Sequence, residues 1–350
     1  MKEIVLSGIR ATGNLHLGNY FGALSKFVKM QEDYDCMYFI ADLHALTTHP
    51  DPKTLHSNVK NILAEYLAAG VDPDKSTIFV QSDVPEISEL YLLLNMHVGI
   101  GELMRTASFK DKARKQLGIK SDNDDIEKEI IGTDSNKRVN AGLLTYPTLM
   151  AVDILIQKAH KVPEGKDQEQ HLELTRRFAR RFNSFYGVDL FPEPENFNFG
   201  GNAVKVPGLD GSGKMGKSEG NCIYLIDEEK VLRKKVMRAV TDEGPKELNS
   251  PVSQPVENLF TLMQLTSAPE VIQQFRDAYA DCSIRYGDLK KQLAEDILKI
   301  TLPIRERILE IQNDDALLAR VVKQGADKAR ERAAKTLSEV REIMGIKKFY

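Results

Sequence analysis

The sequence predicts an α/β protein in which helices cover both faces of a parallel sheet, followed by an all-helical C-terminal region. Three observations support this prediction. Short apolar runs alternate with segments of helical periodicity in the first half of the chain, polar turns follow the apolar runs, and the pattern is nearly all helical from about residue 227. Such alternation is typical of parallel sheets, whose ligands bind where the strands end and the chain order reverses.

The first strand and helix are predicted to meet at a turn that could bind an anion. Residues 3–8 read as a short apolar strand, and residues 17–28 carry apolar side chains on one face of a helix. Gly18 falls in the first helical turn, where free N–H groups and the helix dipole favour a phosphate. His16 and Asn19 add donors beside it. A plain polar turn is the alternative, and the pattern is neither a dinucleotide nor a Walker motif.

The alternation continues toward the middle of the chain. Buried strands are expected at residues 36–42 and 76–81, and helices at residues 55–66 and 85–98. Gly70 is expected to end the first of these two helices, since glycine adopts the left-handed conformation common after a helix.

Residues 115–138 interrupt this alternation. The segment is acidic and poor in apolar residues, so we expect a surface loop or a short exposed helix. It could close over a ligand, and a passive insertion is the alternative. A short strand is expected further on, at residues 160–163.

Residues 146–156 are predicted to form a helix with an unusual face. Pro147 is tolerated in its first turn. Tyr146, Met150 and Asp153 are four and three residues apart and therefore share one side of the helix. Two side chains with apolar bodies beside a carboxylate are unusual for a simple core helix.

A glycine-rich loop with two lysines follows at residues 206–221. Lys214 and Lys217 are charged donors, and Ser218 and Asn221 are neutral ones. A mobile cationic loop suits a reaction in which charge builds up on a phosphate in the transition state. A solvated charged linker is the alternative.

Three amphipathic helices are predicted in the C-terminal part of the chain. Their apolar positions are Val231, Val236, Met237 and Val240 in the first, Ile297, Ile300, Ile304, Ile308 and Ile311 in the second, and Val321, Val322, Ala329, Ala333, Leu337 and Val340 in the third. Residues 318–350 carry nine Lys or Arg against four Asp or Glu. This excess could face RNA phosphates, and a solvated helix face is the alternative.

Composition limits the function classes. A net charge of −3 over 350 residues argues against a global basic field for nucleic acid. Cys36, Cys222 and Cys282 fit no metal or redox spacing, so we expect no protein-bound metal and a reducing, cytoplasmic setting. The sequence shows no export signal and no apolar run long enough to cross a bilayer, so no membrane partner is expected.

Two of these segments resemble the HIGH and KMSKS signatures of class I aminoacyl-tRNA synthetases. Residues 16–19 read His-Leu-Gly-Asn, and residues 214–218 read Lys-Met-Gly-Lys-Ser. Further blocks resemble the bacterial-type tryptophanyl-tRNA synthetases in the same order, so the resemblance covers most of the chain. These blocks are residues 7–24, 142–155, 162–176 and 239–242.

The resemblance implies a Rossmann-like catalytic domain at residues 1–210, a mobile loop and linker at 211–226, and a helical anticodon-binding domain at 227–350. The last helix of such a domain often returns to the catalytic domain. The implied reaction activates L-tryptophan with ATP and Mg²⁺ and transfers it to the 3′ end of tRNA(Trp), releasing pyrophosphate and AMP. The family works as a homodimer.

The resemblance also implies a tryptophan pocket. Asp153 would accept a hydrogen bond from the indole N–H, Tyr146 would help hold the ammonium group, and Met150 would pack on the ring. Gln168 would lie near the charged end of the amino acid. Ser7 and Gly8 complete the expected set.

ATP would be held from two sides. The implied catalytic residues are His16, Asn19, Lys214, Lys217 and Ser218. The other implied ATP-binding residues are Arg10, Ala11, Thr12, Gly18, Gly165, Lys166, Asp167, Lys205, Val206, Met215 and Gly216.

The sequence departs from the family pattern at a few of these positions. Asn19 replaces the last His of the first signature, and Gly216 replaces a hydroxyl donor of the second. Arg10 stands where Gln is common, and Lys205 is unexpected in the strand that meets adenine. Three alternatives remain open: a tyrosyl-tRNA synthetase, a small-molecule nucleotidylyltransferase, and an inactive synthetase-like RNA-binding protein.

Overall fold

Five parallel strands form a single sheet in the computed structural model, which describes residues 2–119, 139–163, 165, 168–197, 199 and 205–349. The strand order is β3-β2-β1-β4-β5. The strands are β1 (Ile4–Arg10), β2 (Asp35–Ala41), β3 (Ser76–Val80), β4 (Lys161–Val162) and β5 (Glu195–Asn196). The chain runs outward from β1 to β3 and then returns to β4. The order therefore reverses at the carboxyl end of β1, where a ligand crevice is expected.

Helices cover both faces of this sheet, as predicted. Val5, Tyr38 and Ile40 belong to the core on one face, and Leu6 and Phe39 belong to the core on the other. A strand that is covered on both faces is apolar at successive positions instead of alternating. This is why the three long strands could be recognised as continuous apolar runs.

The first predicted helix is interrupted. Residues 17–30 form α1 (Leu17–Asn19), a π-helical segment η1 (Tyr20–Leu24) and α2 (Ser25–Met30). Apolar spacing alone does not reveal the π turn, because the apolar side chains still face the core.

The helix predicted at residues 55–66 is α4 (Pro52–Ala68), and the one predicted at 85–98 is α5 (Glu86–Asn95). Gly70, with a φ of +105°, lies two residues beyond α4. The helix predicted at 146–156 is α10 (Tyr146–Ile156). The other helices that the structure describes before the lysine loop are α3 (Asp42–Ala45), η2 (Leu46–Thr48), η3 (Gln81–Asp83), α6 (Ile100–Met104), α7 (Ala107–Leu117), α9 (Ala141–Leu144) and α11 (Glu169–Tyr186). Of the segment 115–138, the first residues end α7, and residues 120–138 lie outside the described residues.

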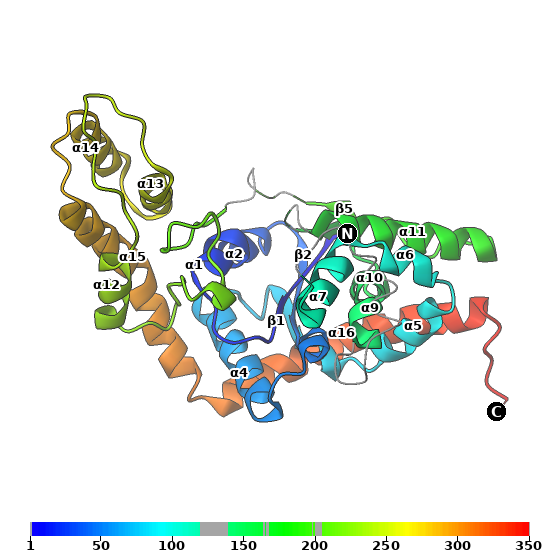
Figure 1. The fold of residues 1–350 in the computed structure, drawn as a ribbon. Helices are drawn as coiled ribbons and strands as arrows, with labels where there is room; N and C mark the ends of the chain where they lie inside the picture. Colours follow the sequence, from blue (N-terminus) through cyan, green and yellow to red (C-terminus); the bar gives the residue numbers. More distant parts are fainter. Residues whose placement is uncertain are drawn as a thin grey trace.

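The C-terminal part is helical, and α13 and α14 lie far from the sheet (Figure 1). Its elements are η5 (Lys217–Glu219), α12 (Glu229–Met237), α13 (Gln254–Thr266), α14 (Pro269–Ala280), α15 (Tyr286–Ile311) and α16 (Asp315–Ile343). The buried face predicted for α12 is right at Val236 and wrong elsewhere: Val231, Met237 and Val240 are exposed, and the buried partner of Val236 is Leu232. A nine-residue helix offers too few turns for apolar spacing to fix its face.

The last helix, α16, leaves the C-terminal helices and covers the free edge of β3. Gly325 lies so close to this strand that a Cβ atom there would be 1.7 Å from the carbonyl oxygen of Ile78. Gln157 of α10 donates to the Ala329 carbonyl at 3.1 Å, and Arg332 pairs with Asp35. Part of the basic excess in this helix therefore forms ion pairs within the protein, and the edge strand is shielded.

Candidate active site

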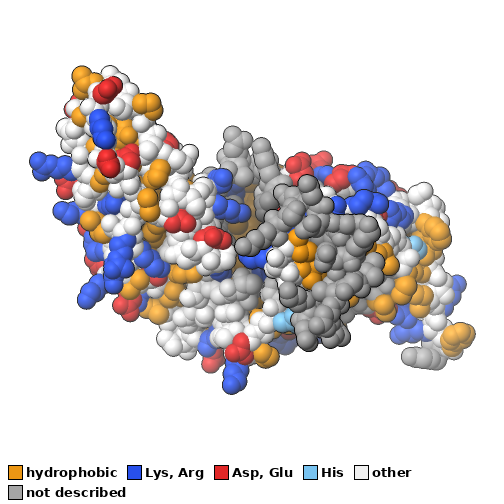
Figure 2. All heavy atoms as spheres, in the orientation of Figure 1, with side chains coloured by type: hydrophobic (Ala, Val, Ile, Leu, Met, Phe, Trp, Pro, Cys, Tyr) orange, Lys and Arg blue, Asp and Glu red, His pale blue; other side chains and the backbone are white. Residues whose placement is uncertain are grey.

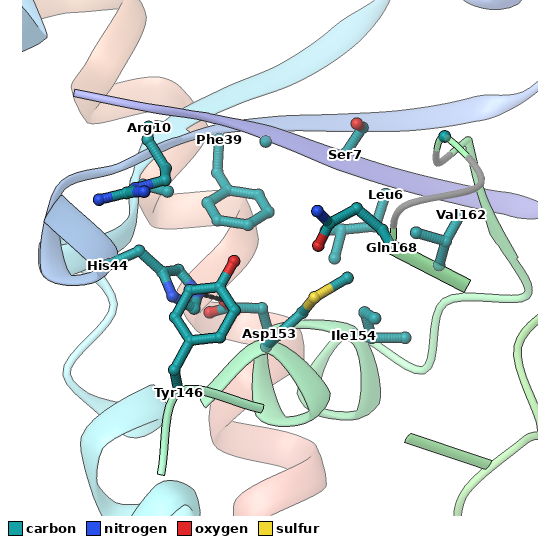
Figure 3. Close-up of a pocket in the computed structure, with 14 residues that line it drawn as sticks. Leu6, Ser7, Arg10, Phe39, His44, Tyr146, Asp153, Ile154, Val162 and Gln168 are labelled. Atoms are coloured by element: carbon teal, nitrogen blue, oxygen red, sulfur yellow. Dashed lines mark hydrogen bonds and ion pairs between the residues drawn. The ribbon is translucent and has the colours of Figure 1, made fainter. Parts of the chain in front are cut away.

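A cavity of about 290 Å³ opens at the carboxyl end of β1, between that strand and α10 (Figure 3). The residues that line it come from β1, β2, α3, α10, β4, the segment after β4 and the start of α11. They are Leu6, Ser7, Gly8, Arg10, Phe39, Ala41, His44, Tyr146, Met150, Asp153, Ile154, Val162, Gly165 and Gln168. All six residues predicted to contact the amino acid are in this set.

The cavity has an apolar wall built around Phe39. A Cβ atom on Gly8 would lie 2.6 Å from the ring atoms of Phe39, so only glycine leaves room for this ring beside β1. Met150 and Ile154 of α10 and Val162 of β4 extend the apolar lining. Such a wall suits a flat apolar ligand group.

Asp153 is the buried polar centre of the cavity. Its side chain is 3 % exposed, and burial raises the pKa of its carboxyl group. His44 Nε2 lies 2.8 Å from Oδ2, and Gln81 Nε2 donates to Oδ1 at 2.8 Å. These two contacts oppose the rise in pKa. A carboxylate has about four acceptor positions, so Asp153 can still accept a hydrogen bond from a ligand.

His44 and Gln81 were not predicted from the sequence. His44 lies on α3 directly after β2, and Gln81 directly follows β3. Polar residues just after buried strands were the available signal, because the carboxyl ends of parallel strands meet at one edge of the sheet.

Cationic groups lie at the mouth of the cavity. Tyr146 packs edge-on against His44, and Lys112 Nζ lies 4.3 Å from the centre of the Tyr146 ring. Burial and the neighbouring Arg10 lower the pKa of Lys112. Figure 3 shows Arg10 and Gln168 reaching the cavity from opposite sides. Lys112 was not predicted from the sequence. The positive charges of Arg10 and Lys112 suit a carboxylate or a phosphate group of a ligand.

The first signature is paired through its backbone with the segment that follows the lysine loop. Leu17 N donates to the Ile223 carbonyl at 2.9 Å, and Leu225 N donates to the Leu15 carbonyl at 3.0 Å. Lys217 Nζ donates to the Gly13 carbonyl at 2.7 Å. The structure thus brings the turn before α1 and the lysine loop together beside the end of β1.

His16 is buried and electrically neutral at pH 7. Burial, and then the positive charges of Lys217 and Lys214, lower its pKa to about 4. Its ring packs over Gly18, where a Cβ atom would be 2.8 Å from two ring atoms. The Asn19 side chain accepts from His16 N at 3.1 Å, which fixes the start of α1. His16 therefore offers a neutral ring beside two ammonium groups.

The lysine loop is organised by Asn221. Its Nδ2 donates to Asp210 Oδ1 at 2.9 Å, and its Oδ1 accepts from Gly216 N at 2.9 Å. Met215 is buried, and its N–H donates to the Val206 carbonyl at 2.8 Å. These hydrogen bonds therefore fix the loop on both sides of Lys214.

The other predicted ATP-binding residues are distributed as follows. Ala11 is buried, Thr12 is exposed, and Lys205 is exposed close to Gly213. Ser218 Oγ donates to Glu219 Oε1 at 3.0 Å. Lys166 and Asp167 lie outside the described residues.

The described part of the chain contains neither a metal-binding cluster nor a membrane-spanning helix. No group of three or more His, Cys, Asp or Glu side chains there could hold a metal ion. None of the helices there combines the length and apolarity needed to cross a membrane.

Comparisons with known proteins agree with this geometry. Residues 2–301 match the family model "tRNA synthetases class I (W and Y)". The chain is similar to the tryptophan–tRNA ligase of Porphyromonas gingivalis, with 62% identity over 99% of this chain and 100% of the relative. It is also similar to the solved structure of the tryptophanyl-tRNA synthetase from Campylobacter jejuni complexed with ADP and tryptophan. That match has 33% identity and a TM-score of 0.82 and covers 98% of this chain and 99% of the other.

Proposed function

The chain belongs to the class I tRNA synthetases that handle tryptophan and tyrosine, and from this we infer that it is an ATP-dependent tryptophan–tRNA ligase. It activates L-tryptophan to tryptophanyl-adenylate and transfers the tryptophanyl group to the 3′ end of tRNA(Trp). Its relatives with this activity match the chain from end to end.

The observation that best supports this function is the position of Asp153. A buried carboxylate, held by His44 and Gln81, faces an apolar cavity beside the turn before α1 and the lysine loop that contacts this turn. An indole N–H can bond to this acceptor, whereas a phenylalanine side chain would leave it unpaired. Leaving a buried polar group unpaired costs about 1–3 kcal/mol, and sites built around such a group reject the analogue strongly.

In the first step, a tryptophan carboxylate oxygen attacks the α-phosphorus of ATP, and the bond to the bridging oxygen of pyrophosphate breaks. No protein nucleophile is needed, so the residues position the reactants and stabilise phosphate charge. We assign this role to His16 and Asn19 on one side, and to Lys214, Lys217 and Ser218 on the other. The contact between Lys217 and the Gly13 carbonyl supports this arrangement.

In the second step, the 2′-hydroxyl of the terminal tRNA ribose takes the tryptophanyl group and AMP leaves. The rest of the ligand contacts follow from the lining of the cavity. Tyr146 and Gln168 hold the ammonium end of tryptophan, and Met150 packs on its ring. Arg10 and Lys112 face the carboxylate and the phosphates, and Mg²⁺ enters with ATP.

The domain roles are part of the same proposal. Residues 1–210 form the catalytic domain, residues 211–226 the loop and linker, and residues 227–350 read the anticodon. The three free thiols suit a cytoplasmic setting.

A homodimer is also proposed, because an apolar patch lies away from the active site. Leu92 and Met96 of α5, Ile100 of α6 and Phe185 of α11 are 56, 68, 66 and 70 % exposed. Figure 2 shows hydrophobic side chains gathered at this end of the molecule. Large exposed apolar patches commonly mark protein interfaces.

The test is amino-acid-dependent exchange of pyrophosphate into ATP. Tryptophan should support exchange, while tyrosine and phenylalanine should not. Lys217→Ala should lower exchange by about 100-fold or more, because a charge-assisted contact that forms in the transition state is lost. Asp153→Asn is the companion variant, and it should raise the KM for tryptophan with little change in that for ATP.

Two results would contradict the proposal. Tyrosine-dependent exchange would support the tyrosyl-tRNA synthetase alternative. Near-normal exchange in Lys217→Ala would exclude the role given to the lysine loop.

A further inference from the structure

Polar side chains of the helix α4 contact the turn of residues 11–15, which lies on the proposed ATP side of the site. Asn58 Nδ2 donates to the Ala11 carbonyl at 3.3 Å, and Asn61 Nδ2 donates to Asn14 Oδ1 at 3.0 Å. One helical turn further on, the Glu65 carboxylate accepts from Leu15 N, with both oxygens at 3.0 Å. The turn that leads into His16 therefore rests on side chains of α4.

Glu65 is the unusual member of this face, because it is 1 % exposed within the main apolar core. Ile62, Leu63 and Tyr66 around it on α4 are all core residues. Burying a carboxylate among such residues costs several kcal/mol unless donors and charges compensate it. A leucine here would pack without that cost, so the carboxylate needs a reason beyond packing.

Lys217 contacts the same turn from the lysine loop, and its positive charge acts to lower the pKa of Glu65. Its Nζ donates to the Gly13 carbonyl, two residues before the N–H that Glu65 accepts. Burial lowers the pKa of Lys217, and Glu65 raises it again. When it is ionised, Glu65 therefore attracts the Lys217 ammonium group beside the turn.

We propose that Glu65 is a positioning residue for the ATP step: its carboxyl group fixes the turn before His16, to which Lys217 also bonds. The inference rests on the proposed function, because it assumes that ATP lies between these two segments. It explains how a lysine from a glycine-rich loop is held close to the first signature before ATP is bound.

The positioning role of Glu65 should depend on pH, because the charge of its carboxyl group does. Burial raises its pKa to about 8, while the Leu15 N–H and Lys217 act in the opposite direction. Glu65 is therefore mostly neutral below pH 8 and ionised above it, and its attraction for Lys217 grows as the pH rises. The titratable groups that interact with Glu65 or with Lys217 in the described part of the chain are Arg10, His16, Tyr66 and Cys222.

The experiment compares pyrophosphate exchange in the wild type, Glu65→Leu and Glu65→Gln. Leucine removes both the acceptor and the charge, whereas glutamine keeps an acceptor for Leu15 N. Glu65→Leu should lower kcat/KM for ATP by about 10–100-fold, because it leaves the buried Leu15 N–H without its acceptor. The KM for tryptophan should change less than about twofold, because Asp153 and its partners are untouched.

Glu65→Gln supplies the readout that a purely structural role would not give. At pH 7 it should retain most of the activity, because Glu65 itself is mostly neutral there. The ratio of wild-type to Glu65→Gln kcat/KM for ATP should then rise between pH 7 and pH 9. Asp296→Asn is the matched control, since Asp296 is a buried carboxylate of α15. The ratio of wild-type to Asp296→Asn kcat/KM for ATP should not change between pH 7 and pH 9.

Two outcomes overturn the inference: a folded Glu65→Leu with wild-type kinetics, or a wild-type to Glu65→Gln ratio that does not change with pH. Should Glu65→Leu fail to fold, the pH ratio decides alone. Lys217→Ala is measured in parallel. Exchange that is normal in the wild type and lost in Lys217→Ala leaves the proposed function intact, whatever the Glu65 variants show.

Discussion

His16 shows how the surroundings of one side chain set its chemistry. Histidine has an ordinary pKa near 6.5, but the buried position beside Lys214 and Lys217 lowers this value to about 4. The neutral ring avoids adding a third positive charge to the site. It can therefore act as a neutral hydrogen-bonding group toward a phosphate at pH 7.

The lowered pKa of His16 predicts a specific acid sensitivity. Between pH 6.5 and pH 4 the unfolded chain binds a proton at His16 that the folded protein does not, so stability falls as the pH drops through this range. The full shift corresponds to about 3 kcal/mol at most. NMR titration should show His16 unprotonated from pH 8 down to pH 5, and unfolding in urea should show less acid sensitivity in His16→Asn.

The exposed His56 supplies the control for this measurement. His56→Asn should leave the pH dependence of unfolding unchanged. A His16 ring that titrates near pH 6.5 would disprove the electrostatic account of the site.

At the scale of elements, the long strands were predictable and the interrupted first helix was not. β1, β2 and β3 lie within two residues of their predicted bounds. They were predictable because strands that are buried on both faces are apolar at successive positions of the sequence. The π-helical η1 and the buried face of α12 depend on contacts with other elements. The spacing of apolar residues within one helix does not show which other elements that helix contacts.

The packing of α16 on β3 predicts a large effect of a single methyl group. In Gly325→Ala the new Cβ would overlap the carbonyl oxygen of Ile78, so the helix and the strand must separate. Overpacking of this kind costs about 1–3 kcal/mol, and more where backbone must move. Urea unfolding should show that loss as a lower midpoint.

Gly287→Ala in α15 is the matched control, because a Cβ atom there meets nothing within 4 Å. It should be neutral or slightly stabilising, since alanine favours helix over glycine. Equal stability of the two variants would mean that α16 does not press on β3 as the structure shows.

At the scale of the whole molecule, the apolar patch on α5, α6 and α11 predicts an assembly. Leu92→Asp with Met96→Asp should convert a dimer to monomers, because two buried charges at an interface cost several kcal/mol. Sedimentation equilibrium measures this directly. The control is Leu248→Asp, a similarly exposed leucine in the C-terminal part, which should leave the mass unchanged. A monomeric wild type would refute the proposed dimer.

The sequence by itself determined the residues whose partners are close along the chain. Tyr146, Met150 and Asp153 share a face because of helical spacing, and all three line the cavity. The turn before α1 and the lysine loop were recognisable for the same reason, since glycines and donors there lie within a few residues of one another.

Only the tertiary structure decided which distant groups complete the site. His44 and Gln81 reach Asp153 because three strand ends and α10 converge, and Lys217 reaches the Gly13 carbonyl because residues 15–17 pair with 223–225. Glu65 became informative only once α4 was seen beneath that turn. The energy of a buried charge depends on its neighbours in space, and no local pattern in the sequence states which neighbours those are.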